Sequence, residues 1–160
     1  MPADLPRGAS PLTAITPIIP GREAAVQAVL DDIKKRISEG GHTPLNDVQT
    51  VHFARWVMLW EGNETRLLFT SNFDGPWEVY IDQFIEHAWQ VFDAIYSNCD
   101  GYPEYGARDS VAFKEFVRKH EVKENVYYKA YPDASVAEVR RALNITRGIR
   151  QVWESLQELS

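Results

Sequence analysis

Four segments of the chain repeat apolar residues at steps of three and four, which is the spacing of one face of an α-helix. The first predicted helix covers residues 22–38 and ends at a pair of glycines. The longest and most regular covers 77–98. A shorter helix follows Asp109, which suits its N-cap. A terminal helix starts at Ser135, where Glu138 has the spacing of a capping box.

Shorter stretches rich in β-branched and aromatic residues predict strands at 12–19, 51–60 and 66–73. The second and third are separated by the turn sequence Glu-Gly-Asn-Glu, so residues 51–73 are expected to form a hairpin. The density of apolar residues in its first half favours a central strand. A fourth strand is predicted at 125–131, where the sequence NVYYKAY ends at a Pro-Asp pair.

The predicted order is strand, helix, strand, strand, helix, small helix, strand, helix. Its core is the βαββαβ pattern of a ferredoxin-like α+β fold. Helices on one face of such a sheet leave the other face bare, and a second copy packed sheet against sheet would cover it. We therefore expect a flexible arm at residues 1–11, a single domain at 12–160, and a homodimer that closes into a dimeric α+β barrel.

The chain has 160 residues, a net charge of −6 and a pI near 5.2. This acidic balance gives no electrostatic reason to expect nucleic acid as a partner. Four arginines near the C-terminus indicate the solvated side of a helix, with an anionic partner as the alternative. A single cysteine, Cys99, excludes an internal disulfide. Because no apolar run suits a signal peptide or a membrane helix, we expect no membrane insertion and cytoplasmic residence.

Strand alternation predicts which side chains face the uncovered side of the sheet. In the strand at 66–73 they include Thr70 and Asn72. In the last strand they are Tyr127, Lys129 and Tyr131. Polar groups among aromatic ones are typical of a ligand pocket, so we expect these side chains to line a cavity.

The strand at 51–60 carries one arginine among apolar residues. Because an unpaired buried charge is costly, Arg55 is predicted to enter the cavity. The alternative is a structural ion pair with Asp74, at the end of the neighbouring strand. His52 and Trp56 fall on the face opposite Arg55, and alternation leaves open which face lines the cavity. All four are therefore candidates, Arg55 and Asp74 for catalysis and His52 and Trp56 for ligand binding.

Three strings, VHFARWVML, LLFTSNFDGPWEVYIDQF and NVYYKAYPDASVAEVR, resemble the dimeric α+β barrel superfamily in their order of elements, over roughly residues 12–140. That superfamily includes chlorite dismutases, dye-decolorizing peroxidases, small heme-degrading monooxygenases and cofactor-free monooxygenases. The Gly-x-x-Asp-Gly motif of its heme peroxidases is matched here only at Asp74 and Gly75. The resemblance implies a homodimeric barrel and, for many members, oxidoreductase activity.

Several heme proteins of this superfamily hold iron through a helix-borne histidine at the rim of a pocket. His87 borders the apolar stripe of the helix predicted over 77–98, so the resemblance implies heme as a cofactor and His87 as its axial ligand. The alternative is a histidine at the edge of the core that is hydrogen-bonded to a neighbour. His120 is expected at the surface and His42 in a glycine-rich loop.

Cys-x-x-Cys, His-Glu-x-x-His and glycine-rich phosphate loops do not occur in the sequence, nor does a Ser-His-Asp order. Hydrolase and nucleotide-binding functions therefore lack their usual motifs. We expect a homodimeric barrel that binds heme or an apolar or aromatic small molecule, with peroxidase-like or monooxygenase-like oxidoreductase activity. The alternative is a non-catalytic binding or accessory protein whose sheet face packs against a partner.

Overall fold

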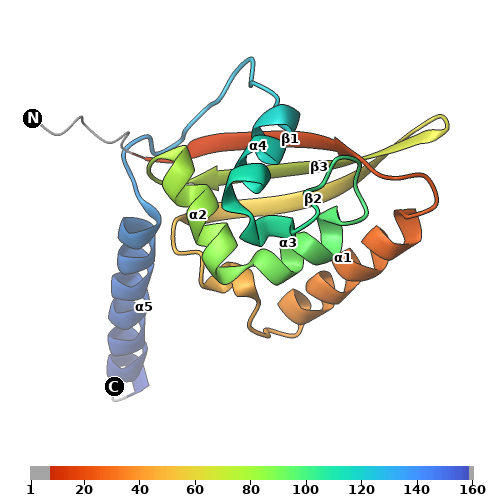
Figure 1. Ribbon diagram of the computed structural model, residues 1–160. Helices are drawn as coiled ribbons and strands as arrows, with labels where there is room; N and C mark the ends of the chain where they lie inside the picture. The colour runs from red at the N-terminus through yellow and green to blue at the C-terminus, as the bar shows by residue number, and fades with distance from the viewer. Residues whose placement is uncertain (1–7, 159–160) are drawn as a thin grey trace, which may run out of the picture.

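Three antiparallel strands form one sheet in the computed structural model, which describes residues 8–158 (Figure 1). The strands are β1 (Ser10–Pro17), β2 (Val51–Glu61) and β3 (Glu64–Phe73), and they lie side by side in the order β1-β3-β2. The predicted hairpin is confirmed, with Gly62 in its turn at a φ of 61° that suits glycine. The fold class α+β is confirmed as well.

The prediction of a central strand at 51–60 is wrong, because β3 is the central strand and β2 pairs along one side only. The apolar residues of β2 divide between two faces. Trp56 and Met58 pack against the core, whereas Phe53 and Val57 are 67% and 40% exposed on the other face. The density of apolar residues in β2 therefore reflects an exposed apolar face beside the buried one, and not burial on both sides.

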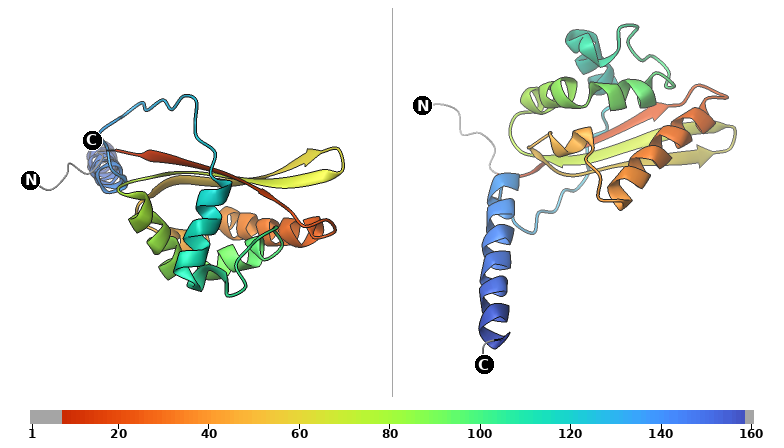
Figure 2. Two further views of the ribbon diagram at one scale, coloured as in Figure 1. Left: turned by 45° about the horizontal axis from the view of Figure 1, so that its top comes forward. Right: turned by 90° about the horizontal axis from the view of Figure 1, so that it is seen from below.

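Helices cover the opposite face of the sheet (Figure 2). They are α1 (Glu23–Ser38), α2 (Trp77–His87), α3 (Trp89–Tyr96) and α4 (Ser110–His120). The 3-10 turn η1 (Pro44–Asn46) lies between α1 and β2, and η2 (Gly106–Arg108) lies between α3 and α4. α1 lies where the apolar spacing predicts it. Asp109 caps α4, because its carboxylate accepts a hydrogen bond from the Ala112 N–H at 3.1 Å.

The single helix predicted over 77–98 is instead two helices that meet at Ala88. This residue is fully buried and has a non-helical φ of −131°. The ring centroids of Phe84 and Phe92, one on each side of the break, lie 6.2 and 6.0 Å from that of Phe69 on β3. A single straight helix would diverge from a twisted sheet, so the break keeps both phenylalanines on the core.

Aromatic rings fill the space between sheet and helices. Phe92 lies at the centre, with its ring centroid within 4.7–6.0 Å of those of Trp56, Phe69, Phe84, Tyr96 and Phe113. Cys99 also belongs to this core, and burial raises the pKa of its thiol to about 12. A thiol in this environment is unreactive at neutral pH.

The segment predicted as a fourth strand forms no ladder within residues 8–158. An isolated bridge between Ala14 and Glu121, and the hydrogen bond from Val122 N to Thr13 O at 2.8 Å, tie the residues just before it to β1. Residues 121–134, which we call the strap, then pass along the side of the sheet opposite the helices (Figure 2). The sheet has three strands in this structure, so the complete βαββαβ order is not formed.

The strap also departs from the predicted alternation. Alternation about Tyr127, Lys129 and Tyr131 places Val126 and Tyr128 under the helices, yet they are 85% and 82% exposed. The helices lie on the other face of the sheet, so residues that cross the uncovered face have solvent and not helices on their outer side.

The terminal helix α5 (Val136–Glu158) begins with the predicted capping box. Ser135 Oγ accepts a hydrogen bond from the Glu138 N–H at 3.2 Å, and the Ser135 N–H donates to Glu138 Oε2 at 2.8 Å. α5 then extends away from the body of the molecule (Figures 1 and 2). Over residues 136–157, Val136 is the one buried side chain.

The predicted arm at residues 1–11 falls mainly on residues 1–7, which lie outside the described residues. Its last two residues belong to β1, which begins at Ser10. Between residues 8 and 158, no helix has both the length and the apolar character that crossing a bilayer requires.

Candidate functional site

The uncovered face of the sheet displays rows of side chains that run from β1 across β3 to β2. The strand registers define four such rows: Pro11–Asn72–Phe53, Thr13–Thr70–Arg55, Ile15–Leu68–Val57 and Pro17–Arg66–Leu59. The alternate residues of β1 and β3 are buried against the helices. Arg55, Thr70 and Asn72 therefore point to the uncovered face, as alternation predicts for Thr70 and Asn72 and as the cost of a buried charge predicts for Arg55.

The strap crosses one end of this face and leaves a groove of about 220 Å³ between itself and the sheet. We call it the strap groove. It is lined by five of the seven residues predicted to bind a ligand: His52 and Asn72 from the sheet, and Tyr127, Lys129 and Tyr131 from the strap. Residues from two distant parts of the sequence thus meet in one place.

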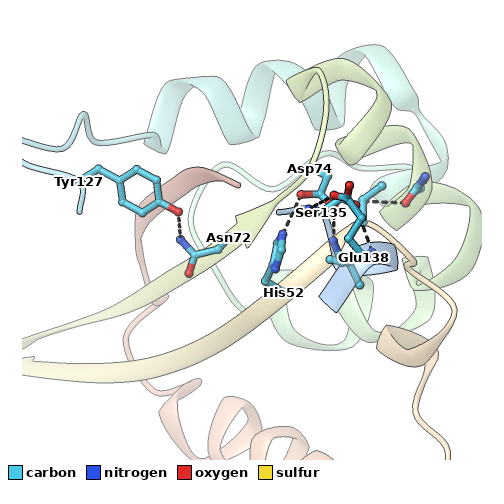
Figure 3. A network of polar contacts seen from close by, with 9 residues as sticks. His52, Asn72, Asp74, Tyr127, Ser135 and Glu138 are labelled. Atoms are coloured by element: carbon cyan, nitrogen blue, oxygen red, sulfur yellow. Dashed lines mark hydrogen bonds and ion pairs between the residues drawn. The ribbon is translucent and has the colours of Figure 1, made fainter. Parts of the chain in front are cut away.

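One hydrogen bond joins the two walls of the strap groove. Asn72 Nδ2 donates to the Tyr127 hydroxyl at 2.9 Å, which places the tyrosine ring over the end of β3 (Figure 3). Lys129 Nζ lies 5.6 Å from the centroid of the same ring. In the part of the chain that the structure describes, Lys129 forms no ion pair. Its charge is therefore available to a ligand in the groove.

His52 lies at a β-bulge that alternation does not anticipate. The register shifts between Val51 and Phe53, so His52 is the extra residue of β2. The bulge turns its ring toward the end of β3, where His52 Nε2 lies 2.7 Å from Asp74 Oδ1 (Figure 3). The other oxygen of Asp74 accepts the Val136 N–H at 2.7 Å. One carboxylate thus joins both strands of the hairpin to the start of α5.

The histidine–aspartate pair has a defined polarity. A carboxylate only accepts hydrogen bonds, so His52 Nε2 is the donor and Nδ1 carries the lone pair when the ring is neutral. Such a nitrogen can accept a hydrogen bond or a proton from a bound molecule. The His52 side chain is 7% exposed, which limits access to what enters the strap groove.

The predicted alternative for Arg55, an ion pair with Asp74, is wrong. Arg55 Nε donates to Thr70 Oγ1 at 2.9 Å on the uncovered face, while His52 and Val136 occupy Asp74. Arg55 and Asp74 therefore do not form a joint catalytic pair. Thr70 belongs to the next row of the sheet, beyond the residues that line the strap groove.

We expect Arg55→Met to change the free energy of unfolding by no more than about 0.5 kcal/mol, because the side chain is exposed and its partner is a neutral hydroxyl. Urea denaturation measures this change. In the double variant Arg55→Met/Asp74→Asn, the free energy of unfolding should differ from that of Arg55→Met by the effect of Asp74→Asn alone. Rescue of an unstable Arg55→Met protein by the second substitution would contradict this geometry.

Trp56 lies on the helix side of the sheet and not in the strap groove. Its Nε1 donates to the Tyr96 hydroxyl at 3.3 Å, and its ring centroid lies 4.9 Å from that of Phe69. The prediction of a ligand-binding role for Trp56 therefore places it on the wrong face. Phe53, which alternation puts beside Arg55, lines the groove instead and was missed.

His87 ends α2, with Nε2 at 3.7 Å from a Glu86 carboxylate oxygen and 37% of the side chain exposed. It lies on the helix-covered side of the sheet, so it is not brought together with the strap groove. At about 220 Å³ the groove is also smaller than ordinary ligand pockets, which start at roughly 300 Å³. Within one copy of the chain these residues do not fit heme.

The described residues also contain no group of three or more His, Cys, Asp or Glu side chains placed to hold a metal ion. The resemblance to dimeric α+β barrel proteins stays a prediction. No protein-family model, no curated protein and no solved structure gives a significant match to the chain.

Proposed function

We propose that this protein binds a small aromatic molecule in the strap groove. The observation that carries the proposal is the convergence of His52, Asn72, Tyr127, Lys129 and Tyr131 on one groove of the uncovered sheet face. Aromatic walls with a small number of placed polar groups are the usual lining of a small-molecule site.

The lining residues indicate the chemistry of the ligand. Phe53, Tyr127 and Tyr131 offer apolar ring surface, and Phe53 and Tyr131 are 67% and 59% exposed. Lys129 supplies a positive charge that has no carboxylate partner among the described residues. A planar aromatic molecule with one anionic group matches both features.

The fluorescent aromatic carboxylate 2-naphthoate is a suitable probe, and isothermal titration calorimetry measures its affinity. We expect one site per chain. Tyr127→Ala should weaken binding about tenfold, because it removes a ring wall and the hydrogen bond that holds the strap to Asn72. Lys129→Ala should weaken it about fivefold, and less at high salt.

Matched controls separate the strap groove from other exposed surfaces. Tyr105→Ala removes a tyrosine that is 74% exposed elsewhere, and Lys123→Ala removes an exposed lysine of the strap outside the groove. Both should bind 2-naphthoate as the parent does. Equal affinity in Tyr127→Ala, Lys129→Ala and the parent would contradict a site in the strap groove.

The second candidate function is that of an accessory protein whose uncovered sheet face packs against a partner. The row Ile15–Leu68–Val57 favours it, because it places apolar side chains on all three strands beyond the strap groove. A second copy of the chain packed on this row would make the predicted homodimer. Heme binding and oxidoreductase activity stay predictions, which a hemin titration followed by Soret absorbance tests.

A further inference from the structure

α5 carries its apolar residues along one seam. Ala142, Ile145, Ile149, Val152 and Leu156 follow one another at steps of three, four, three and four. This is the spacing of the a and d positions of a helix that packs lengthwise against another helix. The four arginines of α5 lie off the seam, at positions 140, 141, 147 and 150.

The seam is open to solvent in a single chain. Ile145, Ile149 and Val152 are 57%, 66% and 63% exposed, and Trp153 beside them is 63% exposed. Gly148 in the middle of the helix lowers its intrinsic stability. Helices in proteins draw most of their stability from packing of an apolar face. Burial of the seam would therefore stabilise α5.

The start of α5 is fixed relative to the sheet. Asp74 accepts the Val136 N–H, and Ser135 and Glu138 form the capping box (Figure 3). These contacts direct the helix away from the body (Figures 1 and 2), and the seam residues Ile145, Ile149 and Val152 are more than half exposed. A surface presented in this way is suited to a second molecule.

Two classes of partner suit such a helix, an anionic membrane surface and a second copy of the chain, and charge distinguishes between them. α5 holds four Arg and three Glu, which leaves 13 basic and 20 acidic residues elsewhere and a net charge of −7 there. An anionic membrane surface would repel this acidic body. Two copies of α5, each with a net charge of +1, repel each other only weakly. When the two helices run in opposite directions, their acidic bodies lie at opposite ends of the pair, further apart than the Debye length of about 8 Å.

We propose that α5 pairs in antiparallel orientation with the α5 of a second copy of this chain. In this orientation the arginines at 140 and 141 of one helix run beside the end of the other that carries Glu154, and the two helix dipoles oppose each other. In a parallel pair, each of the four arginines would lie level with the same arginine of the other helix.

Antiparallel pairing also gives matched layers. Each a position then faces a d position of the second copy. Ile145 faces Ile149, and the small Ala142 faces Val152. Beside the seam, Val139 neighbours Trp153 of the second copy and Gly148 neighbours its equivalent, each pair offset by about 3 Å along the helix axis, and the missing side chain of Gly148 allows close approach. The seam uses no residue of the strap groove or of the uncovered sheet face.

Sedimentation equilibrium of the full chain at micromolar concentration tests the pairing. The parent should have about twice the chain mass of 18.3 kDa. The seam variant Ile145→Ala/Ile149→Ala should sediment as a monomer, and alanine keeps the helix propensity of α5. The control Asn144→Ala/Gln151→Ala, on the polar side of the helix, and the sheet-face variant Val57→Asp should both remain dimers.

A mixture of Ile145→Cys and Ile149→Cys chains tests the orientation, since it should give the mixed disulfide in preference to either like pair. Near-ultraviolet circular dichroism and 2-naphthoate binding unchanged in the seam variant would show that the body stays folded. This keeps failure of the helix pair distinct from failure of the strap groove.

Three results would overturn the inference. They are a monomeric parent, a seam variant that remains a dimer, and flotation of the parent with phosphatidylserine vesicles that the seam variant loses. A monomeric Val57→Asp protein together with a dimeric seam variant would assign the dimer to the sheet face instead.

Discussion

Replacing Phe92 with alanine should lower the free energy of unfolding by about 3–5 kcal/mol. Phe92 is 4% exposed and its ring contacts five other aromatic rings from β2, β3, α2, α3 and α4. Truncation leaves a cavity that rigid neighbouring rings fill poorly. Urea denaturation followed by tryptophan fluorescence measures the change.

Val111→Ala is the control for Phe92→Ala, because Val111 lies on α4 and is 67% exposed. Its effect should stay within about 0.5 kcal/mol of zero. A Phe92→Ala protein that loses less than about 1 kcal/mol would show that α3 does not lie against the sheet at this residue.

Asp74→Ala is expected to lower the free energy of unfolding by about 2–3 kcal/mol. The carboxylate accepts hydrogen bonds from both His52 Nε2 and Val136 N at 2.7 Å, and it is 19% exposed. Hydrogen bonds to a charged acceptor are stronger than neutral ones. Its loss also leaves the 7%-exposed His52 without this partner.

A double-mutant cycle isolates the His52–Asp74 contact. His52→Ala, Asp74→Ala and the double variant should give a coupling free energy of about 1–2 kcal/mol. The same cycle with Arg55→Met in place of His52→Ala should be additive, because Arg55 bonds Thr70. Coupling of Asp74 to Arg55 and not to His52 would refute the arrangement of the hairpin end.

Local pattern was sufficient to predict most of the fold. Apolar spacing located α1 and α4, alternation located the three strands, and the Ser135–Glu138 spacing located the start of α5. These features depend on neighbours along the chain. The break at Ala88 does not, because it follows from how Phe84 and Phe92 both reach Phe69 on a twisted sheet.

The strap shows a second limit of local pattern. NVYYKAY has the composition of a strand, but a strand must also run along an edge of the sheet to pair with it. In this structure the segment leaves β1 after the Val122–Thr13 hydrogen bond and crosses the uncovered face. Tyr127 then bonds Asn72, a contact across 55 positions of sequence that no periodicity encodes.

The candidate site was predictable to the extent that alternation holds. It placed Thr70 and Asn72 on the uncovered face correctly, and the cost of a buried charge placed Arg55 there. It failed at His52, where one extra residue in the bulge reverses the face for the side chain. That same inversion explains why Trp56 was grouped with His52 although its ring lies in the core.

The location of a bound aromatic acid tests the central claim most directly. In ¹⁵N-resolved nuclear magnetic resonance spectra of the full chain titrated with 2-naphthoate, we expect shifts at residues 52 and 53, at 72 and along 127–131. We expect none in the groove between α1 and β2 near Ile37 and Trp60. Shifts confined to that second groove or to α5, with the strap groove unchanged, would contradict the account.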